Sequence, residues 1–163
     1  MQLTDAQRLD WLRLIRTDGV GPRTFRTLVN RFGGAAAALD ALPNLSRRQG
    51  RRIEPPSRIQ AEDELAALAR LGGRLVATGE AEYPRLLQQT DAAPPLLALR
   101  GAAILNRPAV ALVGSRNASM AGLAFTEKLA RGLGEAGLTV VSGSPAGSMR
   151  APTRPACRPA PSR

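Results

Sequence analysis

The apolar residues of this 163-residue chain change their spacing near residue 73, and this change constrains the fold more than any other feature. Before that point they recur every three or four residues, the period of an amphipathic helix. The clearest case places apolar side chains at i, i+3, i+4 and i+7: Phe25, Leu28, Val29 and Phe32. After residue 73 they form short continuous runs, typical of buried strands. The sequence therefore predicts a small all-helical domain over residues 1–72 and an α/β domain over residues 73–143.

Helix-end signals divide the helical domain. Thr4 followed by Gln7 predicts a capping box for a helix that runs through Arg16. Pro22 is expected at a first helical position, and Gly33-Gly34 is expected to end that second helix. A short Ala-rich helix over 35–42, a loop or a weak turn of helix over 43–58, and a last helix capped by Ser57 should follow. The apolar residues expected to face inward are Leu9, Leu12, Ile15, Trp11, Phe25, Phe32, Leu65, Leu68 and Leu71.

The second domain has the order strand, glycine turn, helix, strand. Strands are predicted over 74–77, 96–99, 109–113 and 138–141, with a short helix starting near Tyr83. The 109–113 run is apolar throughout, as in a strand covered on both faces. A longer helix over 119–136 should turn Phe125, Leu129 and Leu133 inward. This order is the beginning of a parallel α/β sheet.

The composition excludes several kinds of chemistry. The chain has no His, which excludes His-based catalytic units and His-ligated metals, and its one Cys excludes an intrachain disulfide or a paired-cysteine zinc site. No apolar run reaches 18 residues and no secretory signal starts the chain, so we expect a soluble, cytoplasmic protein. Its net charge of +10 points only weakly to a polyanionic partner.

The sharpest candidate site is the turn Gly114–Ser119, between the buried strand and the long helix. Ligands of open parallel sheets bind at the carboxyl ends of strands, and a helix N-terminus there attracts anions. Ser115 and Ser119 add hydroxyls, and Arg116 adds a guanidinium that can hold a phosphate with two hydrogen bonds. Arg116 stands where a dinucleotide motif would need its second glycine, which argues against NAD or FAD. A phosphate site and a plain capped turn with an exposed arginine remain equally supported by the spacing.

Other candidates are weaker. The hairpin Gly19-Val20-Gly21-Pro22 can present backbone N–H groups to a DNA phosphate or be a simple turn between helices. A basic cluster can contact phosphates, but acidic neighbours favour a solvated loop: Arg47, Arg48, Arg51, Arg52 and Arg58. Tyr83 and Phe125 can stack on a base, although core packing is the preferred interpretation.

Three segments resemble the DprA/Smf family of DNA-processing proteins of natural transformation. Residues 14–32 resemble its N-terminal helical, SAM-like domain. Residues 83–101, with Tyr83-Pro84 and Pro94-Pro95, resemble its Tyr-Pro…Pro-Pro stretch. Residues 110–122 resemble its Gly-Ser-Arg signature. The resemblance implies a Rossmann-like second domain, single-stranded DNA as ligand, RecA as partner and a homodimer in full-length members. It assigns Gly114, Ser115, Arg116 and Ser119 to the DNA-binding pocket, without catalysis, cofactor or metal.

The resemblance ends at Gly143. Residues 144–163 contain four Arg, no acidic residue and five Pro, and we expect them to be disordered. A one-base shift of a plausible codon series for this tail yields Leu-Ala-Arg-Gly-Leu-Asp followed by Ala-His and Ser-Leu, the segment that family members have there. We interpret the tail as out-of-frame translation of a truncated Rossmann-like domain. A genuine basic tail is the alternative, and the gene sequence distinguishes the two.

Three functions follow as hypotheses. The first is a single-stranded DNA-binding protein that protects incoming DNA and helps to load RecA, impaired here by the truncation. The second is a Rossmann-like nucleotide hydrolase or transferase, disfavoured because no acidic residue lies near the Gly114–Ser119 turn. The third is a duplex-DNA module that acts through the Gly19–Pro22 hairpin. Missing later strands would also leave sheet edges and apolar faces exposed.

Overall fold

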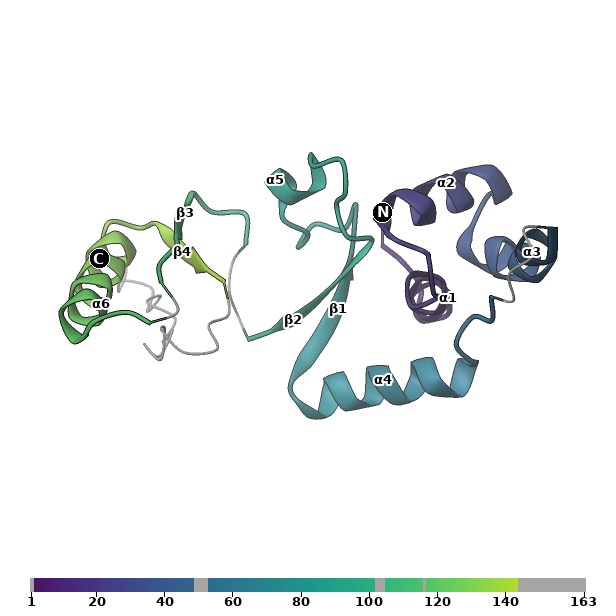
Figure 1. The fold of residues 1–163 in the computed structure, drawn as a ribbon, viewed down its shortest axis with the longest axis horizontal. Coiled ribbons are helices and arrows are strands. Elements are labelled where there is room, and N and C mark those ends of the chain that lie inside the picture. The colour runs from purple at the N-terminus through teal and green to yellow at the C-terminus, as the bar shows by residue number, and fades with distance from the viewer. Residues whose placement is uncertain (1, 49–52, 102–104, 116, 144–163) are drawn as a thin grey trace, which may run out of the picture. The chain divides into compact units, whose positions relative to one another are not determined.

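The computed structural model describes residues 2–48, 53–101, 105–115 and 117–143 (Figure 1). The chain forms two compact units, residues 1–101 and 102–163. The first contains α1 to α5 with β1 and β2, and the second contains β3, α6 and β4. A helical domain followed by an α/β region with parallel strands confirms the predicted fold class.

Local capping explains where the first and fourth helices begin. In α1 (Asp5–Ile15) the Thr4 hydroxyl accepts from the Gln7 N–H, and the Gln7 side chain accepts from the Thr4 N–H. The same reciprocal pair, Ser57 with Gln60, starts α4 (Arg58–Arg70). Each box satisfies two backbone N–H groups that the first turn of a helix leaves without a partner. Both predicted N-caps are therefore confirmed.

The second and third helices differ in how well they were predicted. α2 (Pro22–Phe32) begins with Pro22 at its first turn and ends at Gly33, whose φ of +79° suits glycine. α3 (Ala35–Arg48) does not stop at residue 42 but continues through Pro43. Residues 43–48, predicted as a loop or a weak turn of helix, are helical, so the predicted end of the third helix near residue 42 was wrong. Leu42 is buried and Leu45 packs against the core, which stabilises the longer helix.

Two apolar clusters hold the first unit together. The larger joins α1, α2 and α3 around Leu14, Phe25 and Leu28, with Trp11 against Phe25 at 5.0 Å between ring centroids. The smaller joins Leu9, Leu12 and Ala61, and Leu65 packs against it. These positions confirm most of the predicted helical core. Leu71 is an exception, since it caps the end of α4 and is 60% exposed.

The first two strands belong to the helical unit. β1 (Gly73–Ala77) and β2 (Leu96–Arg100) pair in antiparallel register, and α5 (Arg85–Gln88) lies in the connection between them. Leu75 and Leu96 pack against the Leu9–Leu12–Ala61 cluster. The predicted strands are present, but they complete a compact unit that extends to Gly101 rather than ending at residue 72.

A polar connection reinforces this packing. The Glu80 carboxylate, in the turn after β1, receives hydrogen bonds from the Arg8 guanidinium at 2.8 Å and from the Leu3 N–H at 3.2 Å. Arg8 also donates to the carbonyls of Leu75 and Leu3. Burial alone would raise the pKa of Glu80, but hydrogen bonds from the Ala77 N–H, Arg8 and the Leu3 N–H outweigh it and lower that pKa.

The second unit is a small parallel α/β element. β3 (Ala109–Leu112) and β4 (Thr139–Ser142) pair in parallel, as predicted, and α6 (Met120–Glu135) connects them and lies against β4. Leu133 is half-buried, in keeping with its predicted inward position.

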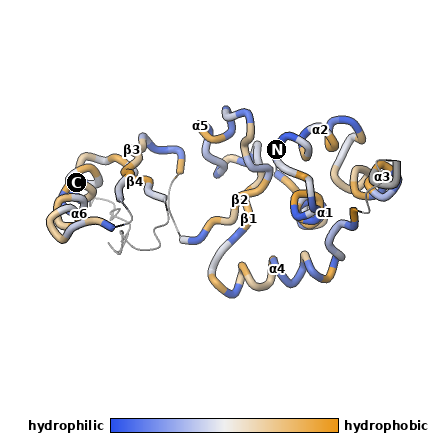
Figure 2. The backbone as a smooth tube through the Cα atoms, viewed as in Figure 1, coloured by the Kyte–Doolittle hydropathy of each residue, from blue (hydrophilic) through white to orange (hydrophobic). Residues whose placement is uncertain are grey.

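This unit leaves much apolar surface exposed. Phe125 and Leu129 were predicted to face inward, but they are 67% and 40% exposed. Val113, at the end of the run predicted to be covered on both faces, is 94% exposed. A single helix covers only part of a two-stranded sheet, so the remaining apolar positions face outward. Figure 2 shows hydrophobic residues along α6 and the strands of this unit.

Candidate nucleic-acid interface

The predicted phosphate turn lies where the topology places ligands, between the carboxyl end of β3 and the N-terminus of α6. Ser119 is the N-cap of α6, and its hydroxyl accepts from the Gly122 N–H at 3.2 Å. The Ser115 hydroxyl accepts from the Asn117 N–H at 3.2 Å. Both serines and Gly114 are exposed to solvent. Three of the four predicted residues therefore share one accessible turn, and Arg116 lies outside the described residues.

The two serine hydroxyls act as acceptors toward the backbone. Each of these hydroxyls retains its own O–H, which can be donated to an anion. The first turn of α6 carries no acidic residue, so its helix dipole is not offset there. The first carboxylate along α6, that of Glu127, is paired with Arg131 at 2.9 Å. The local chemistry of the turn suits a phosphate oxygen.

The hairpin between α1 and α2 has the predicted form. Gly19 has a φ of +76°, and the Val20 N–H donates to the Thr17 carbonyl at 3.0 Å. Val20 is buried in the larger core cluster, whereas Gly19 and Gly21 are exposed. The Thr17 hydroxyl is itself held by the Arg13 carbonyl at 2.9 Å. The hairpin is thus a well-anchored turn whose exposed glycines suit both interpretations.

The predicted basic cluster is only partly described. Arg51, Arg52 and the side chains of Arg47 and Arg48 lie outside the described residues. Arg58 pairs with Glu62 at 2.8 Å, one turn along α4. That pair agrees with a solvated, locally neutralised surface at this position.

The two aromatic candidates, Tyr83 and Phe125, differ in exposure to solvent. Tyr83 is 1% exposed, and its hydroxyl donates to the Pro94 carbonyl at 2.7 Å. This bond connects the Tyr-Pro and Pro-Pro segments. Tyr83 is therefore a core residue, as preferred, and burial raises its pKa. Phe125 is exposed, so the core interpretation was wrong for it within the second unit as described.

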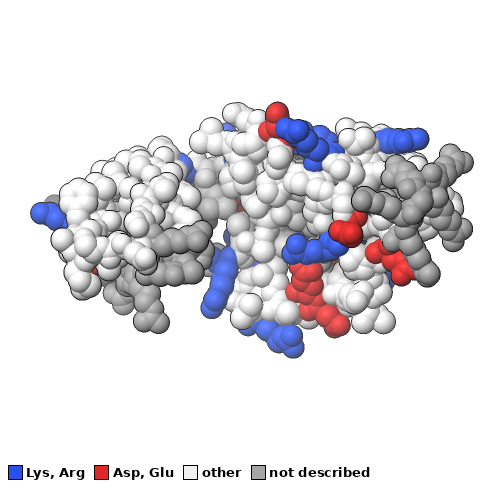
Figure 3. All heavy atoms as spheres, viewed as in Figure 1, with Lys and Arg blue, Asp and Glu red and all other residues white. Residues whose placement is uncertain are grey.

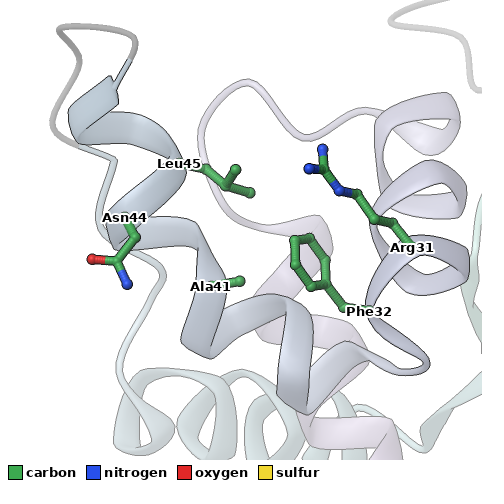
Figure 4. Close-up of a pocket in the computed structure, with 5 residues that line it drawn as sticks. All are labelled: Arg31, Phe32, Ala41, Asn44 and Leu45. Atoms are coloured by element: carbon green, nitrogen blue, oxygen red, sulfur yellow. The ribbon is translucent and has the colours of Figure 1, made fainter.

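Two cavities among the described residues lie in the first unit. The smaller, of about 220 Å³, is lined by Phe32 of α2, Ala41 and Leu45 of α3, and neighbouring Arg31 and Asn44. Figure 4 shows the Phe32 ring pointing toward Leu45, with Arg31 beside it. The Arg31 guanidinium carbon lies 5.4 Å from the centroid of that ring. The larger cavity, of about 550 Å³, lies among α1, α4 and residues 54–56 and is lined by charges of both signs.

Among the described residues, no group of His, Cys, Asp or Glu is arranged to hold a metal ion. Within the same residues, none of the helices has the length and apolar character that a membrane span requires.

Comparison with family models decides the relationship. Residues 5–67 match the model described as the DprA-like N-terminal HHH domain. Residues 74–153 match the model described as DNA recombination-mediator protein A. The chain belongs to the DprA family. Membership supports a DNA-processing role in transformation. Comparison of this DprA family member with curated proteins gives no significant match.

The two matches divide the DprA sequence between residues 67 and 74, close to the predicted boundary at 72. The compact first unit nevertheless includes β1 and β2, which the second model covers. The second match extends to residue 153, ten residues beyond Gly143, where the resemblance was expected to end. Residues 144–163 lie outside the described residues, and their interpretation as an out-of-frame, disordered tail stays a prediction.

One basic surface, on α2, was not predicted from the sequence. α2 carries Arg23, Arg26 and Arg31, all exposed, and no acidic residue. The three arginines are visible in the α2 sequence, Pro-Arg-Thr-Phe-Arg-Thr-Leu-Val-Asn-Arg-Phe. The apolar spacing of the same segment predicts its buried face and not its basic one.

Proposed function

We propose that this DprA family member is a cytoplasmic, non-catalytic protein that binds single-stranded DNA at the β3–α6 turn and helps to load RecA onto it. The observation that carries the proposal is the match to DNA recombination-mediator protein A over residues 74–153, which include this turn. A mediator of recombination acts on the single strand that recombination consumes. The two serine hydroxyls, the helix N-terminus and Arg116 give that strand a phosphate site.

The exposure of the turn also suits a polymer. Gly114, Ser115 and Ser119 lie on the surface, so a continuous strand can cross them without entering an enclosed pocket. Proteins that bind single strands combine a positively charged groove along the phosphates with aromatic rings that stack on the bases. Phe125, exposed one turn into α6, is an aromatic ring in the same unit.

The test is fluorescence anisotropy with a labelled oligothymidylate and the full chain. Arg116→Ala should weaken binding by about fivefold at 0.1 M salt, the counterion-release contribution of one phosphate contact on a single strand. Arg131→Ala is the matched control, because it removes the same charge from the same unit while its side chain pairs with Glu127. Ser115→Ala should weaken binding by a smaller factor.

Three results would reject the proposal. Equal losses in the Arg116 and Arg131 variants would mean that bulk charge alone is sensed. A loss of duplex binding in Arg116→Ala as large as its loss of single-strand binding would exclude the single strand as the preferred ligand of the turn. Turnover of a nucleotide by the purified chain, lost in Arg116→Ala, would favour the hydrolase or transferase hypothesis.

A further inference from the structure

The solvent face of α2 concentrates positive charge on a rigid helix. Phe25 and Leu28 turn into the core, and the opposite face presents Arg23, Arg26 and Asn30, all exposed. Residues three apart on a helix have Cβ atoms about 5–6 Å apart, so these side chains form a row. Arg31 lies about 140° around the helix from Arg26 and contacts the Phe32 ring, so it does not belong to this row. We name Arg23 and Arg26 the α2 arginine row.

The acidic groups around this row are few and weakly held. Within the described residues the row has one ion pair, between Arg23 and Asp91 at 3.5 Å, with side chains 75% and 90% exposed. Such exposed pairs contribute about 0–1 kcal/mol and give way readily to a stronger anion. Asp18 precedes the hairpin and is the nearest acidic residue before α2 in sequence.

The rest of the unit shows the contrast. Three arginines on or next to α1 and α4 pair with carboxylates, namely Arg8 with Glu80, Arg16 with Glu64 and Arg58 with Glu62, whereas Arg70 at the end of α4 has no carboxylate partner among the described residues. In Figure 3, red and blue atoms mix around α4, and on the upper edge of the first unit blue atoms lie beside a red group. The outward face of α2 therefore carries arginines whose charge is offset only weakly by the described carboxylates.

The chemistry of the face favours a duplex backbone over a single strand. Single-strand sites supply exposed aromatic rings for stacking. The outward positions of α2 supply only arginine, threonine and asparagine, and the Phe32 ring is half-buried beside the Arg31 guanidinium. Arginine, threonine and asparagine side chains contact phosphates and sugars, which position a protein on DNA without reading its sequence.

We propose that the α2 arginine row is a second DNA site, which binds the phosphate backbone of duplex DNA independently of the β3–α6 turn. The first unit would hold duplex without sequence preference, while the turn in the second unit holds a single strand. The two sites lie in different compact units, so variants can separate them.

The experiment measures anisotropy of a labelled, blunt hairpin duplex of about 20 base pairs with the full chain. Arg23→Gln combined with Arg26→Gln should weaken duplex binding by roughly eightfold per lost contact at 0.1 M salt. Arg58→Gln combined with Arg70→Gln on α4 is the matched control, because it removes two exposed arginines from the same unit. All four positions are exposed, so the circular dichroism and melting temperature should not change.

Oligothymidylate binding provides the second measurement. The α2 variant should bind the single strand within about twofold of the wild type, and Arg116→Ala should show the reverse pattern. Equal duplex losses in the α2 and α4 variants would overturn the proposal in favour of bulk charge. A loss of single-strand binding without a loss of duplex binding would overturn the assignment of the ligand. An unchanged duplex affinity in the α2 variant would overturn it outright.

Discussion

Replacing Glu80 with Ala should destabilise the first unit far more than replacing Glu82, its neighbour two residues along. The Glu80 carboxylate accepts from the Ala77 N–H at 2.8 Å, the Leu3 N–H at 3.2 Å and the Arg8 guanidinium at 2.8 Å. The side chains of Glu80 and Arg8 are only 11% and 17% exposed. These contacts connect the start of the chain, α1 and the turn after β1.

The magnitude follows from what the substitution leaves behind. Glu80→Ala removes charge-assisted bonds and leaves the Arg8 guanidinium without its carboxylate. Hydrogen bonds to charged groups contribute about 1.5–3 kcal/mol, and breaking a buried pair costs about 3–5 kcal/mol. Because this pair retains some exposure, we expect a loss of about 3 kcal/mol. Glu82 pairs with Arg74 at 2.9 Å with side chains 58% and 43% exposed, so Glu82→Ala should cost at most about 1 kcal/mol.

The assay is urea unfolding followed by tryptophan fluorescence. Trp11 is the only tryptophan of the chain and packs edge-on against Phe25, so its emission reports on the first unit. If the Glu80 and Glu82 variants lose equal free energy of unfolding, Glu80 does not hold the turn after β1 against α1 as described.

The pH dependence gives a second check on the same residue. The pKa of Glu80 is lowered in the folded state, so its contribution is present above the ordinary glutamate pKa of about 4.3 and is lost as pH falls through the folded-state value. Glu80→Gln lacks this titration. The difference in unfolding free energy between wild type and Glu80→Gln should therefore shrink as pH falls from 6 to 3. A difference that stays constant or grows would contradict the assignment.

Three further predictions concern single residues. Tyr83 is the only tyrosine, and burial disfavours its phenolate form. In an absorbance titration at 295 nm it should therefore ionise with a midpoint above the usual tyrosine pKa of 10. A midpoint of 10 in the folded protein would refute its burial. Ser119→Ala should destabilise α6 by about 1 kcal/mol, seen as faster amide exchange in its first turn, with Ser119→Asp restoring protection. Phe125→Gln should lower binding of a hydrophobic dye and raise solubility, because the Phe125 ring is exposed. Leu12→Gln, in the core, should instead unfold the first unit. Unchanged dye binding in Phe125→Gln would mean that Phe125 is covered.

Features that depend on neighbours in sequence were predictable. The capping boxes of Thr4 with Gln7 and Ser57 with Gln60 close within three residues, and Gly33 ends α2 through its own backbone freedom. The place of the phosphate turn also follows from local order, because a strand, a glycine and a helix in succession define where the turn must lie.

Features that depend on distant partners were not predictable in this way. α3 continues past Pro43 because Leu42 and Leu45 pack against other helices. The free energy of this packing outweighs the cost of a proline inside a helix. The apolar spacing of Phe125 and Leu129 identifies a stripe but cannot say whether anything covers it. Arg8 and Glu80 are 72 positions apart, so nothing local joins β1 to the helical unit.

The central claim, that the turn after β3 holds a DNA phosphate, is tested most directly by the salt dependence of single-strand binding. Anisotropy titrations of wild type, Arg116→Ala and Arg131→Ala with oligothymidylate should be made from about 0.05 to 0.3 M salt. Each phosphate contact on a single strand contributes about 0.7 to the slope of log affinity against log salt. The account predicts that Arg116→Ala lowers that slope by about 0.7 while Arg131→Ala leaves it unchanged. Identical slopes for all three proteins would contradict it.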